Sequence, residues 1–290
     1  MEKENNLQTL AQYSTIQIGG TADNIFAPAT RDELCSIIKE YTSRNLLFIG
    51  GGSNLLLPPV IDGSVVLDVN LPRVLDCVGT QVTVSSNYPI GSLLRQLMPQ
   101  NIGGLEFLAG IPAHIGGLVK MNAGAWGESI GQFISSVLVI NNEGEIEEIT
   151  AESIEFGYRT SNIPGYILEV TLELKEIGAN EIEQRFRKIL AHRNESHPLD
   201  TPSLGCFFKN LVDDEGNKTS AGKLIDDCGL KGTRIGGATV SNSHANFIIN
   251  IQNATYEDVT ELSYLIQNTV LNQTGVLLEP EVIIIQGREV

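Results

Sequence analysis

The spacing of hydrophobic and polar residues changes along the chain and predicts a mixture of helices and strands. The capping box Thr30-Arg-Asp-Glu33 precedes apolar residues at helical spacing, which predicts a helix at that point. From Ile167 to Leu174, apolar and polar residues alternate, as in a strand with one solvated face. Between the cap residues Thr255 and Gly275, the pattern predicts a helix from Tyr256 to Thr274.

Shorter elements fill the intervals between these segments. The pattern predicts strands at Leu46–Ile49, Val65–Val69, Gln81–Ser85 and Glu281–Ile285, a hairpin of Val137–Ile140 with Ile146–Ile149, helices at Ile90–Leu97 and Glu181–His192, and a glycine-rich loop region at Asn101–Gly124. Two prolines in His197-Pro-Leu-Asp-Thr-Pro202 predict a domain boundary there. Since helices and strands follow no regular alternation, we expect an α+β fold rather than a doubly wound sheet.

Composition narrows the classes of function. Among 290 residues, 35 are acidic and 19 basic, so the formal net charge is −16. Such a chain is a poor general binder of nucleic acid or anionic membranes. No stretch approaches the roughly 20 apolar residues of a membrane span, and the polar start predicts no signal peptide, so we expect a cytoplasmic protein. Four scattered cysteines have no metal-binding spacing, and we expect reduced thiols and no metal site.

Cations are concentrated in one part of the chain. Residues 181–240 contain nine of the 19 basic residues and an equal number of acidic ones, so the rest of the chain carries the whole net charge of −16. We therefore expect an anionic ligand to bind this part.

Glycine clusters are the first candidate sites. Gly50-Gly-Gly-Ser-Asn54 follows a predicted strand, and consecutive glycines allow close backbone approach and turn amides toward an anion such as a diphosphate. The segment lacks the signatures of a Walker A loop and of a Rossmann turn. Taken alone, it is better explained as a tight turn.

A second glycine-rich region comprises Ala109-Gly-Ile-Pro-Ala-His-Ile-Gly-Gly117 and Met121-Asn-Ala-Gly124. Backbone donors and small side chains at this density suit a flat, extended cofactor that lies along the main chain. The alternative is a glycine-rich structural crossover. A further segment, Gln17-Ile-Gly-Gly-Thr21, makes this alternative less attractive.

Three other segments carry reactive side chains. The arginine of Gly157-Tyr-Arg-Thr-Ser161 could pair with a carboxylate or an oxyanion, although surface salt bridges are more common. The cysteine of Gly205-Cys-Phe-Phe-Lys-Asn210 is either a buried apolar residue or an acid/base thiol. The second glutamate of Leu278-Glu-Pro-Glu-Val282 begins an apolar strand, where a carboxylate needs a partner unless the strand end is exposed. His114 and His244 are interpreted as structural.

The order of the motifs strongly resembles that of the UDP-N-acetylenolpyruvoylglucosamine reductase family, in its shorter type II form. The resemblance runs from about Tyr13 to Ile285. The segments that carry it are Ile18-Gly-Gly20, Gly50-Gly-Gly-Ser-Asn54, Gly104-Leu-Glu-Phe-Leu-Ala-Gly-Ile-Pro112, Gly116-Gly117, Met121-Asn-Ala-Gly124, Gly157-Tyr-Arg159, Gly205-Cys-Phe-Phe-Lys-Asn210, Ser220-Ala-Gly222, Gly229-Leu-Lys-Gly232, Ile235-Gly-Gly-Ala238, His244-Ala-Asn-Phe247 and Leu278-Glu-Pro-Glu-Val282.

This resemblance implies a fold and an activity. It implies an FAD-binding region of the vanillyl-alcohol oxidase type at residues 1–180, with α+β subdomains at about 1–74 and 75–180, and a C-terminal α+β substrate domain at 181–290. In the family, NADPH reduces non-covalently bound FAD. The reduced flavin then reduces UDP-N-acetylglucosamine enolpyruvate to UDP-N-acetylmuramate. This product is a precursor of peptidoglycan in the cell wall, on which cell shape and cell division depend. We expect a monomer with small-molecule ligands and no nucleic-acid partner.

The resemblance also assigns roles to residues. The catalytic residues would be Arg159, which stabilises an enolate, Glu281, which assists, and Cys206, which donates a proton. The expected FAD-binding residues are Gly50, Gly51, Gly52, Ser53, Asn54, Gly110, Ile111, Gly116, Gly117, Asn122, Ala123 and Gly124. The expected substrate-binding residues are Tyr158, Lys209 and Asn210.

The chain departs from the family pattern at three places. Cys206 stands where most members have a serine, and a thiol, whose ordinary pKa is about 8.5, is a stronger acid than an alcohol. Ala113-His114 stands where Gly-Ser is common. The segment His192–His197 is less basic than usual, which leaves Arg193 as one candidate for the cation that holds the substrate diphosphate.

Two other interpretations stay open. One is an FAD oxidoreductase of the same fold that uses oxygen. The other is a catalytically inactive module that binds a nucleotide sugar and has lost the usual serine. Two facts argue against the second: Arg159 and Glu281 both remain, and the thiol of Cys206 is still a proton donor.

Overall fold

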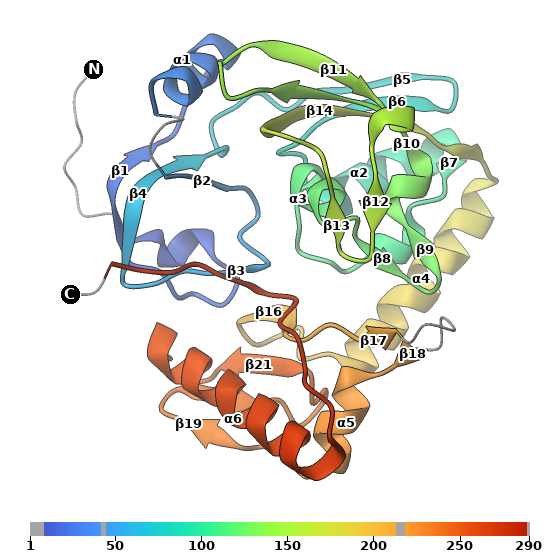
Figure 1. Cartoon of the computed structure of the whole chain (residues 1–290). Coiled ribbons are helices and arrows are strands. Elements are labelled where there is room, and N and C mark those ends of the chain that lie inside the picture. The colour runs from blue at the N-terminus through green and yellow to red at the C-terminus, as the bar shows by residue number, and fades with distance from the viewer. Residues whose placement is uncertain (1–8, 42–44, 213–217, 289–290) are drawn as a thin grey trace. The chain divides into compact units, whose positions relative to one another are not determined.

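The computed structural model describes residues 9–41, 45–212 and 218–288, and the chain divides into two compact units (Figure 1). Unit 1 comprises Met1–Ala22, Gly52–Asp62 and Arg193–Val290. Unit 2 comprises Asp23–Gly51 and Gly63–His192. Both contain helices and strands, which confirms the α+β prediction. Among the described residues, no helix is both long and apolar enough to cross a membrane.

An antiparallel sheet forms the centre of unit 2. Its strands, in spatial order, are β11 (Ile146–Thr150), β10 (Ile134–Ile140), β14 (Tyr166–Glu173), β6 (Gln81–Ser85) and β5 (Leu75–Val78). Four of these strands, β11, β10, β14 and β6, include segments that the sequence predicts as strands. In β14, Glu169, Thr171 and Glu173 are more exposed than their apolar neighbours, as the alternation predicts.

Helices cover this sheet and supply its core. Figure 1 shows α2 (Ile90–Leu97) and α3 (Ile115–Lys120) beside this sheet. Their apolar residues are buried in one cluster with those of β6, β10 and β14. A second cluster joins α1 (Arg31–Tyr41) to residues of β10 and β14. These clusters make the sheet a rigid support for the loops that it connects.

The region Asn101–Gly124 corrects one expectation. The sequence predicts a loop there, but the region contains α3 and the strand β7 (Ile102–Gly103), which pairs with β15 (Lys175–Glu176). Gly116 and Gly117 lower the helical propensity of α3, while its Ile115, Leu118 and Val119 are buried. Burial of these side chains therefore overrides the weak local signal.

A smaller sheet combines β1 (Thr21–Phe26), β4 (Val60–Leu67) and β2 (Leu46–Ile49), in the order β1-β4-β2. Strand β2 pairs in parallel with the last four residues of β4 and then enters the glycine turn. The strand expected at Val65–Val69 therefore starts earlier and ends at Leu67, and Val69 is exposed.

Unit 1 is built around a second antiparallel sheet. Its order is β16 (Ser203–Cys206), β21 (Phe247–Asn250), β20 (Ala238–Val240) and β19 (Arg234–Ile235). Helices α5 (Ala221–Asp227) and α6 (Tyr256–Thr274) contribute to one apolar cluster with it. Helix α6 has its predicted bounds, with a capping box at Thr255 and a left-handed Gly275 at its end.

The remaining elements are short or connecting. They are β3 (Leu55–Leu56), which pairs with β22 (Ile283–Ile284), the hairpins β8 (Gly124–Ala125)–β9 (Glu128–Ser129), β12 (Phe156–Gly157)–β13 (Thr160–Ser161) and β17 (Leu211–Val212)–β18 (Lys218–Thr219), and the helix α4 (Ala179–Ser196). Helix α4 is longer than predicted at both ends. The predicted strand Glu281–Ile285 is reduced to β22.

Candidate functional site

Two of the predicted cofactor segments lie against each other in unit 2. A Cβ atom added to Gly51 would lie 3.3 Å from the backbone nitrogen of His114 and 3.4 Å from the carbonyl oxygen of Pro112. The glycine turn therefore packs closely on the segment Pro112–His114. A side chain at this position would be in tight contact, and the neighbouring backbone would have to shift by a few tenths of an ångström to accept it.

A buried polar pair lies under Gly50. The carboxylate Oδ1 of Asp68 is 3.7 Å from Nδ1 of His114. Within the described residues, neither of these two buried atoms has a hydrogen-bond partner. A Cβ atom added to Gly50 would lie 3.2 Å from Asp68 Oδ2 and 3.6 Å from His114 Nδ1. The glycine backbone thus passes directly over the pair.

The segment after His114 is held by a backbone hydrogen bond at Gly116 and has free space beside Gly117. Gly116 donates to the carbonyl of Ser86 at 2.8 Å. A Cβ atom on Gly117 would meet nothing within 4 Å among the described residues. Gly110 has a φ of +82°, and the next residue, Ile111, donates to Leu108. This combination of close backbones, open space and unsatisfied polar atoms fits a flat cofactor with an anionic part.

Gly52, Ser53 and Asn54 follow Gly51 in sequence but belong to unit 1. Gly52 has a φ of +58°, and an added Cβ would lie 1.8 Å from the carbonyl oxygen of Tyr13. The amide of Asn54 donates to the carbonyl of Glu281 at 3.2 Å. A predicted cofactor residue is therefore a direct neighbour of a predicted catalytic residue.

Asn122 connects the second glycine-rich region to the hairpin that carries Arg159. Its side-chain amide donates to the carbonyl of Gly157 at 2.8 Å, and its side-chain oxygen accepts from Gly131 at 3.1 Å. The next residues, Ala123 and Gly124, lead into β8, and Ala123 donates to Leu118 at 2.8 Å. The predicted cofactor segment thus supports the predicted catalytic hairpin.

Arg159 lies in the turn between β12 and β13, next to Tyr158. Its φ of +58° is uncommon for a residue with a side chain and is a local strain of the kind found at functional sites. The guanidinium carbon lies 5.1 Å from the centre of the Tyr158 ring, within cation–π range. The turn therefore holds a cation and an exposed aromatic ring together.

In unit 1, a bulge positions Cys206. Strand β16 pairs with β21 at Ser203 and Cys206, and the register shifts between them. Gly205, within the bulge, has a φ of +79°. Bulges redirect the side chains of a strand, and here the redirected residue is the candidate proton donor. Cys206 is half-buried, whereas Phe207 and Phe208 are fully buried.

Glu281 lies on the segment beside Cys206. The backbone nitrogen of Glu281 donates to the carbonyl of Phe207 at 2.8 Å, and Lys209 donates to the carbonyl of Glu279 at the same distance. Phe208 also forms an antiparallel bridge with Pro280. The two motifs, far apart in sequence, are therefore joined by backbone hydrogen bonds and one isolated β-bridge. The structure brings Cys206 and Glu281 together in unit 1, while Arg159 and Tyr158 belong to unit 2.

The predicted substrate residues Lys209 and Asn210 continue the same segment. Lys209 Nζ lies 3.5 Å from Glu279 Oε2 in an exposed ion pair. The side-chain oxygen of Asn210 accepts from the backbone nitrogen of Ala221, at the start of α5, at 3.1 Å. Asn210 therefore has a structural contact as well as its predicted contact with substrate.

Asn246 is a supporting residue that sequence reasoning missed. It is buried, its side chain accepts from the backbone nitrogen of Phe208 at 2.9 Å, and it donates to the carbonyl of Phe208 at 2.8 Å. Its own carbonyl accepts from Phe207 at 2.7 Å. Asn246 thus holds the two residues that follow Cys206. Its only signal in the sequence is its place in the motif His244-Ala-Asn-Phe247.

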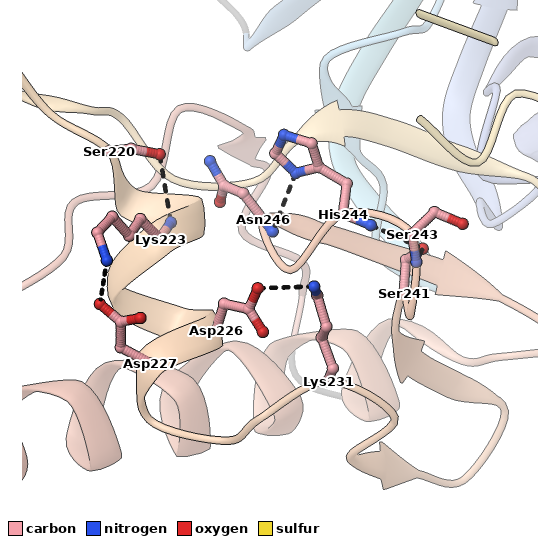
Figure 2. Close-up of polar contacts among 9 residues, drawn as sticks. All are labelled: Ser220, Lys223, Asp226, Asp227, Lys231, Ser241, Ser243, His244 and Asn246. Atoms are coloured by element: carbon pink, nitrogen blue, oxygen red, sulfur yellow. Dashed lines mark hydrogen bonds and ion pairs between the residues drawn. The ribbon is translucent and has the colours of Figure 1, made fainter. Parts of the chain in front are cut away.

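Figure 2 shows the polar groups around Asn246. Its backbone nitrogen donates to Nδ1 of His244 at 3.3 Å, and Lys231 forms an ion pair with Asp226 at 2.6 Å. Burial, together with the charge of Lys231, lowers the pKa of His244. His244 therefore favours the neutral form, in which Nδ1 accepts the Asn246 hydrogen bond.

Arg193 is an electrostatic neighbour of Cys206. Burial lowers the pKa of Arg193, and the negative charge of ionised Cys206 opposes this effect. Arg193 stays a candidate for the cation that holds the substrate diphosphate. The structure adds an electrostatic interaction with the candidate proton donor.

Comparisons with known proteins identify the family of the chain. The C-terminal domain of UDP-N-acetylenolpyruvoylglucosamine reductase matches residues 197–285, and an FAD binding domain matches residues 22–150. UDP-N-acetylenolpyruvoylglucosamine reductase 2 of Bacillus cereus (strain ZK / E33L) is 37% identical over 286 residues, which cover 96% of this chain and 91% of that one. The reductase of Bacillus subtilis (strain 168) is 36% identical, over 97% of this chain and 93% of its own.

A solved structure gives the same result. The UDP-N-acetylenolpyruvylglucosamine reductase of Thermus caldophilus matches with a TM-score of 0.81 and 33% identity, over 96% of this chain and 98% of its own. The chain therefore belongs to the UDP-N-acetylenolpyruvoylglucosamine reductase family and is an FAD-dependent oxidoreductase.

Proposed function

We propose that this enzyme uses NADPH to reduce UDP-N-acetylglucosamine enolpyruvate to UDP-N-acetylmuramate in peptidoglycan precursor synthesis. The observation that carries the proposal is the pairing of the Cys206–Lys209 segment with Glu279–Val282, with Glu281 bonded to Phe207. These hydrogen bonds bring the segment of a potential proton donor and the segment of a carboxylate side by side, in a chain that belongs to the reductase family. We also propose a monomer without a nucleic-acid partner.

The residues would divide the chemistry as follows. Bound FAD would supply a hydride, received from NADPH, to the terminal carbon of the enolpyruvyl double bond. The electron pair of that bond moves onto the substrate carboxylate, where Arg159 stabilises the resulting enolate. Cys206 then gives its thiol proton to the α carbon and is left as a thiolate. Glu281 assists the proton balance at that step.

The cation Arg193 suits this role of Cys206. A thiol that gives up its proton becomes an anion, and a nearby guanidinium stabilises that anion. The interaction of Arg193 with ionised Cys206 supports this assignment. Arg193 would accordingly stabilise the Cys206 thiolate that remains after the proton has been transferred to the substrate.

We propose that the two glycine-rich regions hold FAD. The residues assigned to it are Gly50, Gly51, Gly52, Ser53, Asn54, Gly110, Ile111, Gly116, Gly117, Asn122, Ala123 and Gly124. Close packing of Gly50 and Gly51 on Pro112–His114 supports this assignment. Tyr158, Lys209 and Asn210 are assigned to the substrate, and Lys209 must leave its exposed pair with Glu279 to meet a diphosphate.

The test is an anaerobic titration followed by visible absorbance. NADPH is added to the purified protein and is expected to bleach the flavin bands, which should return when the enolpyruvyl sugar nucleotide is added. In Cys206→Ala, bleaching should persist while the return slows by at least about 100-fold, since general acid catalysis contributes about 10²–10⁴. Cys206→Ser should retain activity.

The matched control is Cys228→Ala, which removes another half-buried thiol of unit 1. It should reoxidise at the parental rate. Equal reoxidation of Cys206→Ala and the parent would remove Cys206 as the donor. Flavin that bleaches but does not recover with the sugar nucleotide would contradict the proposed substrate, and recovery with oxygen alone would favour an oxygen-using enzyme.

A further inference from the structure

We propose that Asp68 and His114 form a charge dyad that binds the diphosphate of FAD. In this dyad, His114 is a cation held between the Asp68 carboxylate and a phosphate oxygen. The inference rests on the assignment of the Gly50–Gly51 and Pro112–Gly117 segments to FAD under the proposed function. It adds a charged side chain to a site otherwise assigned to backbone amides and small residues.

The first observation is the burial of the carboxylate. Asp68 is 5% exposed, and its Oδ1 has no hydrogen-bond partner within the described residues. A buried carboxylate without compensation is costly, so a cation or a proton donor must face it. Nδ1 of His114, at 3.7 Å, is the group that faces Oδ1.

The second observation is the support on the other side of the carboxylate. The hydroxyl of Tyr166 is hydrogen-bonded to Asp68 and lies 3.0 Å from Ser86 Oγ. Burial, followed by the charge of Asp68, raises the pKa of Tyr166, so the phenol keeps its proton and donates it. Since Oδ1 has no partner, this bond uses the other oxygen. The carboxylate is therefore held from one side and directed at His114 from the other.

The third observation concerns the imidazole. Nδ1 is buried against Asp68, whereas the His114 side chain as a whole is 17% exposed, so part of the ring reaches solvent. The Asp68 carboxylate lies 3.7 Å from Nδ1, which is ion-pair distance but longer than a hydrogen bond. An imidazolium in this position has its second N–H, on Nε2, available for an acceptor.

The fourth observation is the position of the dyad under the glycine turn. Gly50 passes over both the carboxylate and the imidazole, and Gly51 packs on the backbone of His114. An anion bound by this turn would be repelled by Asp68 if the carboxylate had no cation beside it. His114 removes this conflict, because a single imidazolium neutralises the carboxylate and attracts the phosphate. The diphosphate is the anionic part of FAD, which is why we assign the dyad to it rather than to the flavin ring.

The test measures dissociation constants of the apoprotein for FAD and for riboflavin, which lacks phosphate, by the change in flavin fluorescence. His114→Gln should weaken FAD binding by about 10- to 100-fold, the range for a charged hydrogen bond. Riboflavin affinity should change less than about twofold. His114→Ser is the second variant, and circular dichroism of each apoprotein checks that it is folded. His192→Gln is the control for removal of another imidazole of unit 2.

A double-mutant cycle separates this role from a structural one. Asp68→Asn should weaken FAD binding in the parent, because the imidazole loses its counter-charge. In the His114→Gln background, the same change should strengthen FAD binding, because it removes an uncompensated negative charge. A purely structural pair would weaken binding in both backgrounds, and that result would overturn the dyad.

Gly51→Val tests the underlying assignment. Weaker FAD binding in Gly51→Val, with His114→Gln and His114→Ser at parental affinity, would reject the dyad and keep the glycine turn in the FAD site. Parental FAD affinity in all of these variants would reject both the dyad and the assignment of the glycine turn to the FAD site. Equal losses for FAD and riboflavin in His114→Gln would place the imidazole at the flavin ring and overturn the diphosphate assignment.

Discussion

At the scale of single residues, the candidate site depends on backbone positions that accept no side chain. Gly52 is the clearest case, because its φ is +58° and the carbonyl of Tyr13 occupies the place of a Cβ atom. A left-handed conformation costs an ordinary residue roughly 1–2 kcal/mol before any clash is counted. The turn that continues into Ser53 and Asn54 thus has its shape fixed by packing on residues near the start of the chain.

We expect Gly52→Ala to destabilise the protein by more than about 2 kcal/mol, because strain and a backbone clash add together. Urea unfolding of the FAD-free protein measures the change. Gly117→Ala is the matched control. Gly117 lies in α3, where a Cβ atom meets open space, so alanine should be neutral or stabilising by up to about 1 kcal/mol. Similar losses in both variants would contradict the argument.

The residue types of the site can be predicted from sequence, but their supports cannot. Motif order predicts Cys206 and Glu281 as candidates, whereas the hydrogen bond from Glu281 to Phe207 joins segments far apart in the chain. Asn246 gives no chemical signal because a buried amide that supports backbone groups has the same sequence appearance as any other asparagine. From the sequence, His114 is interpreted as structural, because the local pattern does not show that the buried carboxylate of Asp68 lies beside it.

At the scale of elements, the sequence predicts periodic segments well and glycine-rich ones poorly. Helix α6 has its predicted bounds because Thr255 and Asp258 form a capping box and Gly275 adopts the left-handed conformation. Helix α3 escapes prediction because two of its six residues are glycines. Strand β16 escapes it too, since its bulge at Gly205 interrupts any alternation. In both α3 and β16, tertiary packing stabilises an element that local propensity does not favour.

His244, in the loop before β21, should make the free energy of unfolding depend on pH. The pKa of His244 is lowered in the folded protein from its ordinary value near 6.5, first by burial. As pH falls through that value, the unfolded chain binds a proton before the folded one does, so the free energy of unfolding decreases. We expect a loss between about pH 7 and pH 5 that is smaller in His244→Gln. Urea unfolding at several pH values measures it.

His192→Gln serves as the control for that experiment, since it removes a histidine of unit 2 that lies against Trp126. Its pH profile should follow the parent. If His244→Gln also follows the parent, the neutral imidazole of His244 does not contribute to the acid sensitivity of the fold.

At the scale of the whole molecule, neither unit is formed from one continuous stretch of chain. Ile16, Ile18 and Leu56 are buried in the same apolar cluster as residues of α5, α6 and β21. The resemblance implies a division after residue 180, and the two prolines predict one at 197–202. Cofactor binding before the division and substrate binding after it stay predictions. Local periodicity carries no information about which distant segments complete a core.

We expect a fragment of residues 193–290 to lack a cooperative thermal transition. Without Ile16, Ile18 and Leu56, its apolar cluster would be left with cavities, and each lost large side chain costs about 2–5 kcal/mol. Near-ultraviolet circular dichroism against temperature, with the full chain as control, measures this. A sharp transition in the fragment would show that the N-terminal residues are dispensable for the core of unit 1.

The three separate stretches of unit 1 also set an order of events during synthesis on the ribosome. Ile16 and Ile18 leave the exit tunnel first, whereas most of the residues that bury them are made last. Both stretches of unit 2 are complete before the C-terminal stretch of unit 1 exists, so unit 2 can collapse while the nascent chain is still growing. Unit 1 must then close around a long intervening segment, which makes its completion a late and comparatively slow step in the life of each new molecule.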